Sequence, residues 1–105
     1  MKESVTTWLE GQIINEEVEF TLVELCRVSG ASAEEVSLWV AEGAFEPHGT
    51  GPHEWRFRGT ELRRVRTAHH LAQDFEINPP GIALALELLD EIEALRANPR
   101  RVRKG

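Results

Sequence analysis

The histidines and the single cysteine are the side chains best suited to metal chemistry, but their spacing does not favour it. His48 and His53 lie in a segment rich in glycine and proline, and His69 and His70 are neighbours in a predicted helix, so they point in different directions. Cys26 falls on the apolar side of another predicted helix. No Cys-x-x-Cys or His-Glu-x-x-His spacing occurs. We therefore expect no metal site and no cofactor.

Catalytic motifs are also missing from the sequence. There is no Gly-x-Ser-x-Gly segment and no glycine-rich loop that opens a helix and could hold a phosphate. Carboxylates are numerous, but no isolated pair of them has a predictable environment for acid–base catalysis. We expect the protein not to be an enzyme.

The distribution of charge predicts an acidic surface that attracts basic groups of a partner. The 105-residue chain has a formal net charge of −6, and residues 1–54 hold two basic side chains against eleven acidic ones. No Lys or Arg occurs from 28 to 55, whereas basic side chains are frequent from 56 to 66 and from 96 to 104. Because carboxylates repel phosphate, the acidic region disfavours nucleic acid and favours a basic protein partner.

Length and composition are those of one small soluble domain. A single domain typically holds roughly 100–200 residues, and 41% hydrophobic with 29% charged residues is an ordinary globular composition. No apolar run approaches the roughly 18 residues that a membrane span needs, and no secretory signal is visible. One cysteine fits a reducing compartment, so we expect a cytoplasmic protein.

Two short predicted helices with a glycine between them form a helix-turn-helix. Thr21 and Glu24 are spaced as a capping box at the start of the first helix, and Ser32 and Glu35 repeat that spacing at the start of the second. Gly30 supplies the left-handed residue that ends the first helix.

A small wing is predicted after the helix-turn-helix. Residues 44–59 are interrupted by glycines and prolines, which predicts a hairpin or wing with a flexible tip at 48–53. Trp55 and Phe57 alternate with arginines, as in a half-buried strand.

Two longer helices follow the wing. Thr60 is placed to cap a third helix that ends near Phe75, and a fourth helix is predicted over about 80–97 after two prolines. At the two ends of the chain, residues 1–19 predict extended structure and residues 98–105 a basic flexible tail.

Six residues are the candidates for contact with a partner. Val36, Trp39 and Val40 already supply a core face, so Leu38 is expected to point outward among acidic side chains as an apolar anchor. Burial of Leu38 and a merely solvated face of glutamates are the alternatives. The predicted partner-binding residues are Glu34, Glu35, Ser37, Leu38, Glu42 and Glu46.

The fourth helix has an apolar arc wider than one small domain needs to cover. The predicted packing or dimer residues on one stripe are Ile82, Leu86, Leu89 and Ile92, and Leu84, Leu88 and Leu95 form a second stripe. We expect a second subunit to cover the excess, which makes the protein a homodimer.

The third helix carries a cluster of arginines whose role has two interpretations. Arg63, Arg64 and Arg66 can pair with Glu61 and with acidic residues of a neighbouring helix. Phosphate binding is the alternative. Ion pairing is the expectation here.

Segments at 20–26, 32–36, 45–47, 55–57 and 80–92 carry a family resemblance. The last of them opens with Pro-Gly-Ile-Ala-Leu-Ala-Leu and is the most specific. Together they resemble the MerR-type proteins and, more closely, their chaperone-modulator branch, the CbpM family. The predicted fold class over residues 20–97 is therefore mainly α: a MerR-like winged helix-turn-helix with a small β wing and a long C-terminal helix.

The resemblance implies a specific role. CbpM-like proteins are bacterial modulators that bind the J-domain of CbpA, a DnaJ-like co-chaperone, and block its stimulation of DnaK. J-domains carry a basic second helix that faces DnaK, which an acidic surface would fit. The alternatives are a MerR-like regulator, which would need basic residues on the second helix to read DNA, and a module that only dimerises.

Overall fold

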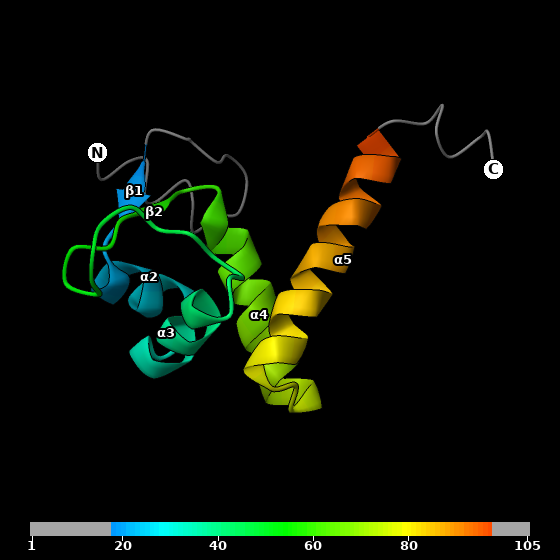
Figure 1. Ribbon diagram of the computed structural model, residues 1–105, viewed down its shortest axis with the longest axis horizontal. Helices are drawn as coiled ribbons and strands as arrows, with labels where there is room; N and C mark the ends of the chain where they lie inside the picture. Colours follow the sequence, from blue (N-terminus) through cyan, green and yellow to red (C-terminus); the bar gives the residue numbers. More distant parts are fainter. Residues whose placement is uncertain (1–17, 98–105) are drawn as a thin grey trace.

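The computed structural model describes residues 18–97, in which helices and a two-stranded antiparallel sheet form the fold (Figure 1). The elements are β1 (Glu19–Phe20), α2 (Leu22–Ser29), α3 (Ala33–Ala41), β2 (Phe57–Arg58), α4 (Glu61–Phe75) and α5 (Pro79–Ala97). This architecture confirms the predicted fold class. The predicted extended segment up to residue 17 and the tail from residue 98 lie outside the described residues.

Both predicted capping boxes are present, and they fix where α2 and α3 begin. The Thr21 hydroxyl accepts from Glu24 N at 3.1 Å, and Thr21 N donates to the Glu24 carboxylate at 2.9 Å. Ser32 and Glu35 exchange the same two bonds at 3.0 Å each. A cap of this kind contributes about 1 kcal/mol. Gly30 ends α2 at a φ of 91°, so the predicted helix-turn-helix is confirmed.

The wing combines a two-stranded sheet, with two residues in each strand, and one isolated β-bridge. β1 and β2 pair antiparallel, with Phe20 opposite Phe57. His48 and Arg56 close the tip by exchanging backbone hydrogen bonds of 3.1 and 2.9 Å. Phe57 is buried while Arg56 and Arg58 are exposed, which confirms the predicted alternation. The main pairing of β2 is therefore with β1 rather than within a hairpin.

One hydrophobic core joins the helices to the sheet. Its most deeply buried large side chains are Leu25, Val36, Trp39, Phe57, Val65, Ile82 and Leu86. The Trp39 and Phe45 rings lie 6.3 Å apart and tilted by 48°, whereas Trp55 is half-buried with its ring edge-on to Phe57 at 6.0 Å. These contacts orient α3, because Trp39 and Val36 fix which side of that helix faces inward.

The start of α4 differs from the sequence-based prediction. Thr60 occupies the N-cap position, but its side chain makes no capping bond. Its backbone is already helical, with φ −64° and ψ −16°, whereas a side-chain cap needs an extended N-cap residue. The predicted Thr60 cap is therefore wrong, and Gly59 O instead accepts from Leu62 N at 3.1 Å.

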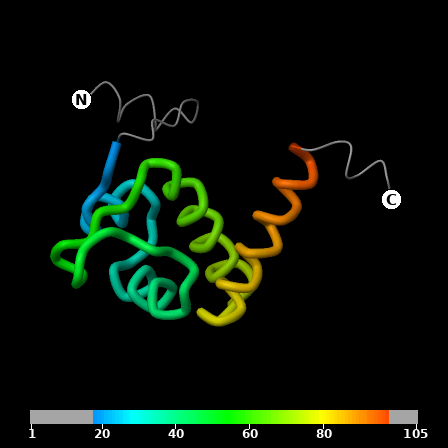
Figure 2. Tube along the Cα trace, turned by 45° about the horizontal axis from the view of Figure 1, so that its top comes forward, coloured from blue at the N-terminus to red at the C-terminus, as the bar shows by residue number. Residues whose placement is uncertain are grey.

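Helix α5 leaves the body at an angle. Asn78 opens the helix, since its side-chain oxygen accepts from Gly81 N at 2.9 Å. The first turns of α5 pack against α3 and α4 and bury Ile82 and Leu86. The later turns stand away from the body in two views (Figures 1 and 2). A 19-residue helix spans about 28 Å, so its distal end projects well beyond the core.

Glu76, which follows α4, provides a test of the fold because it has a left-handed backbone with φ 55° and ψ 39°. An L-residue in this region costs roughly 1–2 kcal/mol, which glycine avoids at some cost in chain entropy. We expect Glu76→Gly to raise the free energy of unfolding by about 0.5–1 kcal/mol, measured by urea denaturation followed by circular dichroism.

Glu76→Ala is the matched control, since it removes the same carboxylate but keeps the Cβ atom. It should give no comparable gain. A glycine variant less stable than the wild type would show that Glu76 is not strained.

Candidate functional site: the outer face of helix α3

Three predicted partner residues form one row on the outer face of α3. Glu34, Leu38 and Glu42 follow one another at intervals of four residues, which places them on the same side of the helix. All three are exposed, and Leu38 leaves 47% of its surface open to solvent. The opposite side holds the buried Val36 and Trp39. An apolar side chain therefore lies between two carboxylates at the surface, and we call these three residues the α3 row.

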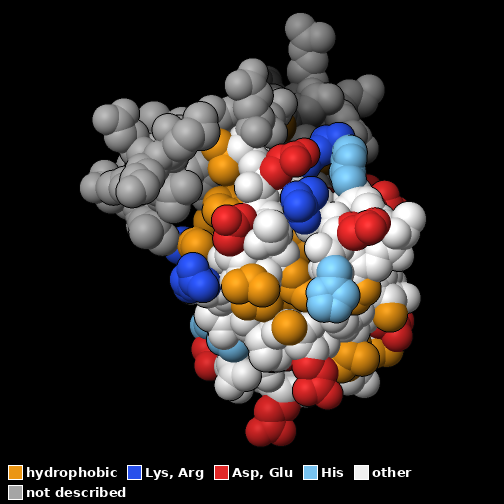
Figure 3. Space-filling model, turned by 90° about the vertical axis from the view of Figure 1, so that its left-hand side faces the viewer, with side chains coloured by type: hydrophobic (Ala, Val, Ile, Leu, Met, Phe, Trp, Pro, Cys, Tyr) orange, Lys and Arg blue, Asp and Glu red, His pale blue; other side chains and the backbone are white. Residues whose placement is uncertain are grey.

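The charge around the α3 row is one-sided. Figure 3 views the molecule from the side of α2, α3 and the wing, and shows carboxylates at the lower edge of this face with Lys and Arg side chains only higher up. Helix α3 contains no basic residue at any position. A cationic surface would meet attraction here, and a phosphate would meet repulsion.

Glu35 lies outside the row and has structural partners. Its carboxylate accepts from Ser32 N at 3.0 Å in the capping box. It also lies 3.3 Å from Nδ1 of His69 on α4, and only a quarter of its side chain is exposed. Ser37 is half-buried. The predicted set is thus divided, because Glu35 serves α3 itself while Glu34 and Glu42 face solvent.

Glu46 lies after α3, in the loop that leads to the wing. It lines two neighbouring hollows of about 250 and 350 Å³, and Glu61 is the other residue common to both. The larger hollow also contains Asp90 of α5, so three carboxylates border it. Glu46 is exposed. The sequence gives no sign that Glu61 and Asp90 are neighbours of Glu46, because only the fold brings α4 and α5 to this loop.

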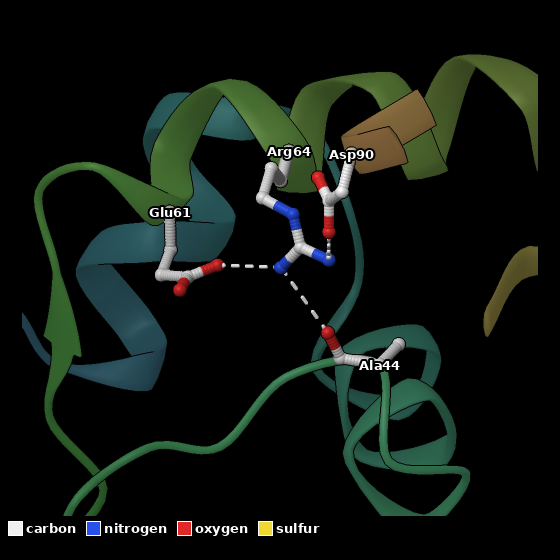
Figure 4. A network of polar contacts seen from close by, with 4 residues as sticks. All are labelled: Ala44, Glu61, Arg64 and Asp90. Atoms are coloured by element: carbon white, nitrogen blue, oxygen red, sulfur yellow. Dashed lines mark hydrogen bonds and ion pairs between the residues drawn. The ribbon is translucent and has the colours of Figure 1, made fainter. Parts of the chain in front are cut away.

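Arg64 neutralises part of this acidic border (Figure 4). Its guanidinium donates to Glu61 at 2.9 Å and to Asp90 at 3.1 Å, and also to the Ala44 carbonyl at 3.2 Å. The same group lies 5.1 Å from the centre of the Phe45 ring. The predicted pairing of the α4 arginines with Glu61 and with a neighbouring helix is confirmed for Arg64.

Two of the histidines, His69 and His70, take part in local pairs. His70 lies 2.8 Å from Asp74 one turn later on α4, and His69 pairs with Glu35. Among residues 18–97, no group of three or more His, Cys, Asp or Glu side chains is arranged to hold a metal ion.

The wing tip uses Glu54 to hold its own turn. The Thr50 hydroxyl donates to the Glu54 carboxylate at 2.7 Å. Hydrogen bonds from the side chain and the backbone of Thr50 lower the pKa of Glu54. Although Glu54 belongs to the acidic region of the sequence, this bond gives it a role within the loop.

The four α5 residues predicted for packing or dimerisation separate into two pairs. Ile82 and Leu86 are buried in the core. Leu89 and Ile92 are 39% and 45% exposed. The second stripe is also open at Leu84 and, further along, at Leu88, so apolar side chains remain at the surface of the projecting half of α5.

The thiol of Cys26, on α2, offers a measurable test of its own partial burial and of its closeness to Glu35. Burial raises its pKa, and the nearby Glu35 carboxylate raises it further. Glu35→Gln keeps a capping acceptor but removes the charge. We expect the pH midpoint of Cys26 alkylation by iodoacetamide to fall in this variant, while burial keeps it above that of a free cysteine.

Glu34→Gln is the control for this experiment, because it removes the neighbouring but exposed charge. Its alkylation profile should match that of the wild type. A midpoint that Glu35→Gln leaves unchanged or raises would contradict the contribution of Glu35.

Within the described part of the chain, no helix is both long enough and apolar enough to cross a membrane.

A model of the MerR HTH family regulatory proteins matches residues 20–104.

Several relatives match most of the chain, and each is named a chaperone modulatory protein, CbpM. The protein from Coxiella burnetii (strain Dugway 5J108-111) is 34% identical over 96 residues, or 91% of each chain. That from Pseudomonas entomophila (strain L48) is 38% identical over 76% of this chain and 79% of its own. That from Salmonella arizonae is 34% identical over 81% and 84%. These names describe a regulatory rather than a catalytic role, and the chain belongs to the CbpM family of chaperone modulatory proteins, within the MerR helix-turn-helix group.

Proposed function

We propose that this protein binds the J-domain of a CbpA- or DnaJ-like co-chaperone and thereby inhibits its stimulation of DnaK. The observation that carries the proposal is the α3 row, in which the exposed Leu38 lies between Glu34 and Glu42. This row occupies the helix that reads DNA in winged helix-turn-helix proteins.

The α3 row has the composition of a docking surface for a basic helix. Leu38 offers an apolar anchor, and the two glutamates offer charge that attracts lysine or arginine side chains on either side of it. Occupying the basic helix of the J-domain in this way would deny it to DnaK. Inhibition then requires binding alone, without catalysis or a cofactor.

Glu46 extends the acidic surface beyond the end of α3. Glu61 and Asp90, which border the same hollow, are held by Arg64, whereas no ion pair is found for Glu46 among the described residues. Glu46 is therefore the carboxylate of this border that is available to a partner. When a partner lies along the α3 row, a cationic side chain at the edge of its interface would contact Glu46.

DNA binding finds less support in the same residues. A recognition helix places donors and cations toward bases and phosphates. The exposed side chains of α3 include carboxylates but no Lys or Arg.

The proposed interface can be tested by reversing the charge of the α3 row. We expect Glu34→Lys combined with Glu42→Lys to weaken binding of a purified J-domain about tenfold or more, since cations would then face cations. Isothermal titration calorimetry measures the change. Glu35 is left intact, because its replacement would disturb the capping box and the contact with His69.

Glu87→Lys combined with Glu93→Lys provides the matched control, with the same charge change on exposed positions of α5. It should leave the affinity within a few-fold of the wild type. Equal affinity for both double variants would remove the α3 row from the mechanism. Tight binding of a specific duplex DNA with a steep salt dependence would favour the regulator instead.

We also propose that the protein is a homodimer, in which the projecting half of α5 meets a second copy. The exposed Leu88, Leu89 and Ile92 supply apolar surface that the single chain leaves uncovered. With a cytoplasmic chaperone system as the proposed partner, we place the protein in the bacterial cytoplasm.

Sedimentation equilibrium tests the dimer. Leu89→Asp combined with Ile92→Asp should convert it to a monomer, because two carboxylates would be buried in an apolar contact. Leu38→Asp, an equivalent change at an exposed position of α3, should leave the mass unchanged. A wild type that sediments as a monomer at micromolar concentration would contradict the proposed dimer.

A further inference from the structure

The distal half of α5 has little apolar attachment to the body. Ile82 and Leu86 are the buried residues of this helix, and no residue from 87 to 97 is buried. In Figures 1 and 2 the orange end of α5 stands clear of the other helices. Apolar packing therefore holds α5 at its base, and any further restraint on the direction of its distal turns must come from a polar contact.

Asp90 supplies that contact. Its carboxylate accepts from Nη2 of Arg64 at 3.1 Å. Among residues 18–97, this is the one side-chain ion pair or hydrogen bond that links residues 87–97 to the body. It acts one turn beyond Leu86, at the point where the helix begins to leave the core.

Arg64 is itself held firmly enough to act as a fixed point. Its Nη1 donates to both Glu61 and the Ala44 carbonyl (Figure 4). Its guanidinium also lies over the Phe45 ring. These partners lie on α4 and on the loop after α3, so the guanidinium is oriented from two elements before it reaches Asp90. A planar fork with several donors can make these bonds at once, which a lysine could not do in the same way.

We propose that Arg64 is a positioning residue that fixes the direction of α5, by joining Asp90 to Glu61 and to the Ala44 carbonyl. This assignment does not depend on which partner the α3 row binds. Because α5 is long, a small rotation at its base displaces the distal end by several ångströms. The ion pair therefore sets where the exposed apolar side chains of α5 lie relative to α3.

Residual dipolar couplings of the full ¹⁵N-labelled chain test this role directly, since they report the orientation of each amide. In the wild type, residues 87–97 and helices α2–α4 should fit one common orientation. In Asp90→Ala we expect the couplings of residues 87–97 to lose agreement with that orientation, while those of α2–α4 keep it and show that the body is folded. Arg64→Met, which removes the donors but keeps an apolar stem beside Phe45, should give the same loss.

Glu91→Ala is the control, because it removes a carboxylate from the next, exposed position of the same helix. It should retain the wild-type orientation. The proposal is overturned if Asp90→Ala keeps that orientation, because a contact other than the ion pair would then be fixing the direction of α5. It is also overturned if Glu91→Ala loses the orientation to the same extent.

Discussion

The burial of one side of α3 is the constraint on which the rest of the structure depends. Val36 and Trp39 are buried in the core, so the side chains four positions apart on the opposite face must meet solvent. Trp39 packs near Phe45, and Phe45 lies under the guanidinium of Arg64. The same contacts that turn the α3 row outward thus continue through Arg64 to α5. A partner surface and a projecting helix are held by one connected set of interactions.

The parts of the fold encoded in neighbouring residues could be predicted from the sequence. The capping boxes at Thr21 and Ser32 need only a partner three residues away, and both are present. The side chain of Thr60 was expected to cap α4 by the same kind of reasoning, but its backbone is helical there. The identity of a residue does not determine the backbone conformation that a capping bond requires.

The candidate site could be predicted only in part, because tertiary contacts decide which carboxylates are available. Glu34 and Glu35 are adjacent in sequence, yet Glu35 is shared between its own cap and His69, which is 34 residues away. The exposure of Leu38 follows from the burial of its neighbours, although the sequence alone is also compatible with a buried Leu38. The acidic border of Glu46, Glu61 and Asp90 requires α4 and α5 to meet the loop after α3, which no local pattern indicates.

In this proposal the second helix of the helix-turn-helix, α3, binds a protein rather than DNA. The most direct measurement is to map the amide chemical-shift changes of the ¹⁵N-labelled protein as an unlabelled J-domain is added. We expect the largest changes to cluster at Glu34, Leu38 and Glu42 and to continue to Glu46. Changes confined to α5 or spread evenly over the chain, or their absence at saturating J-domain, would contradict it.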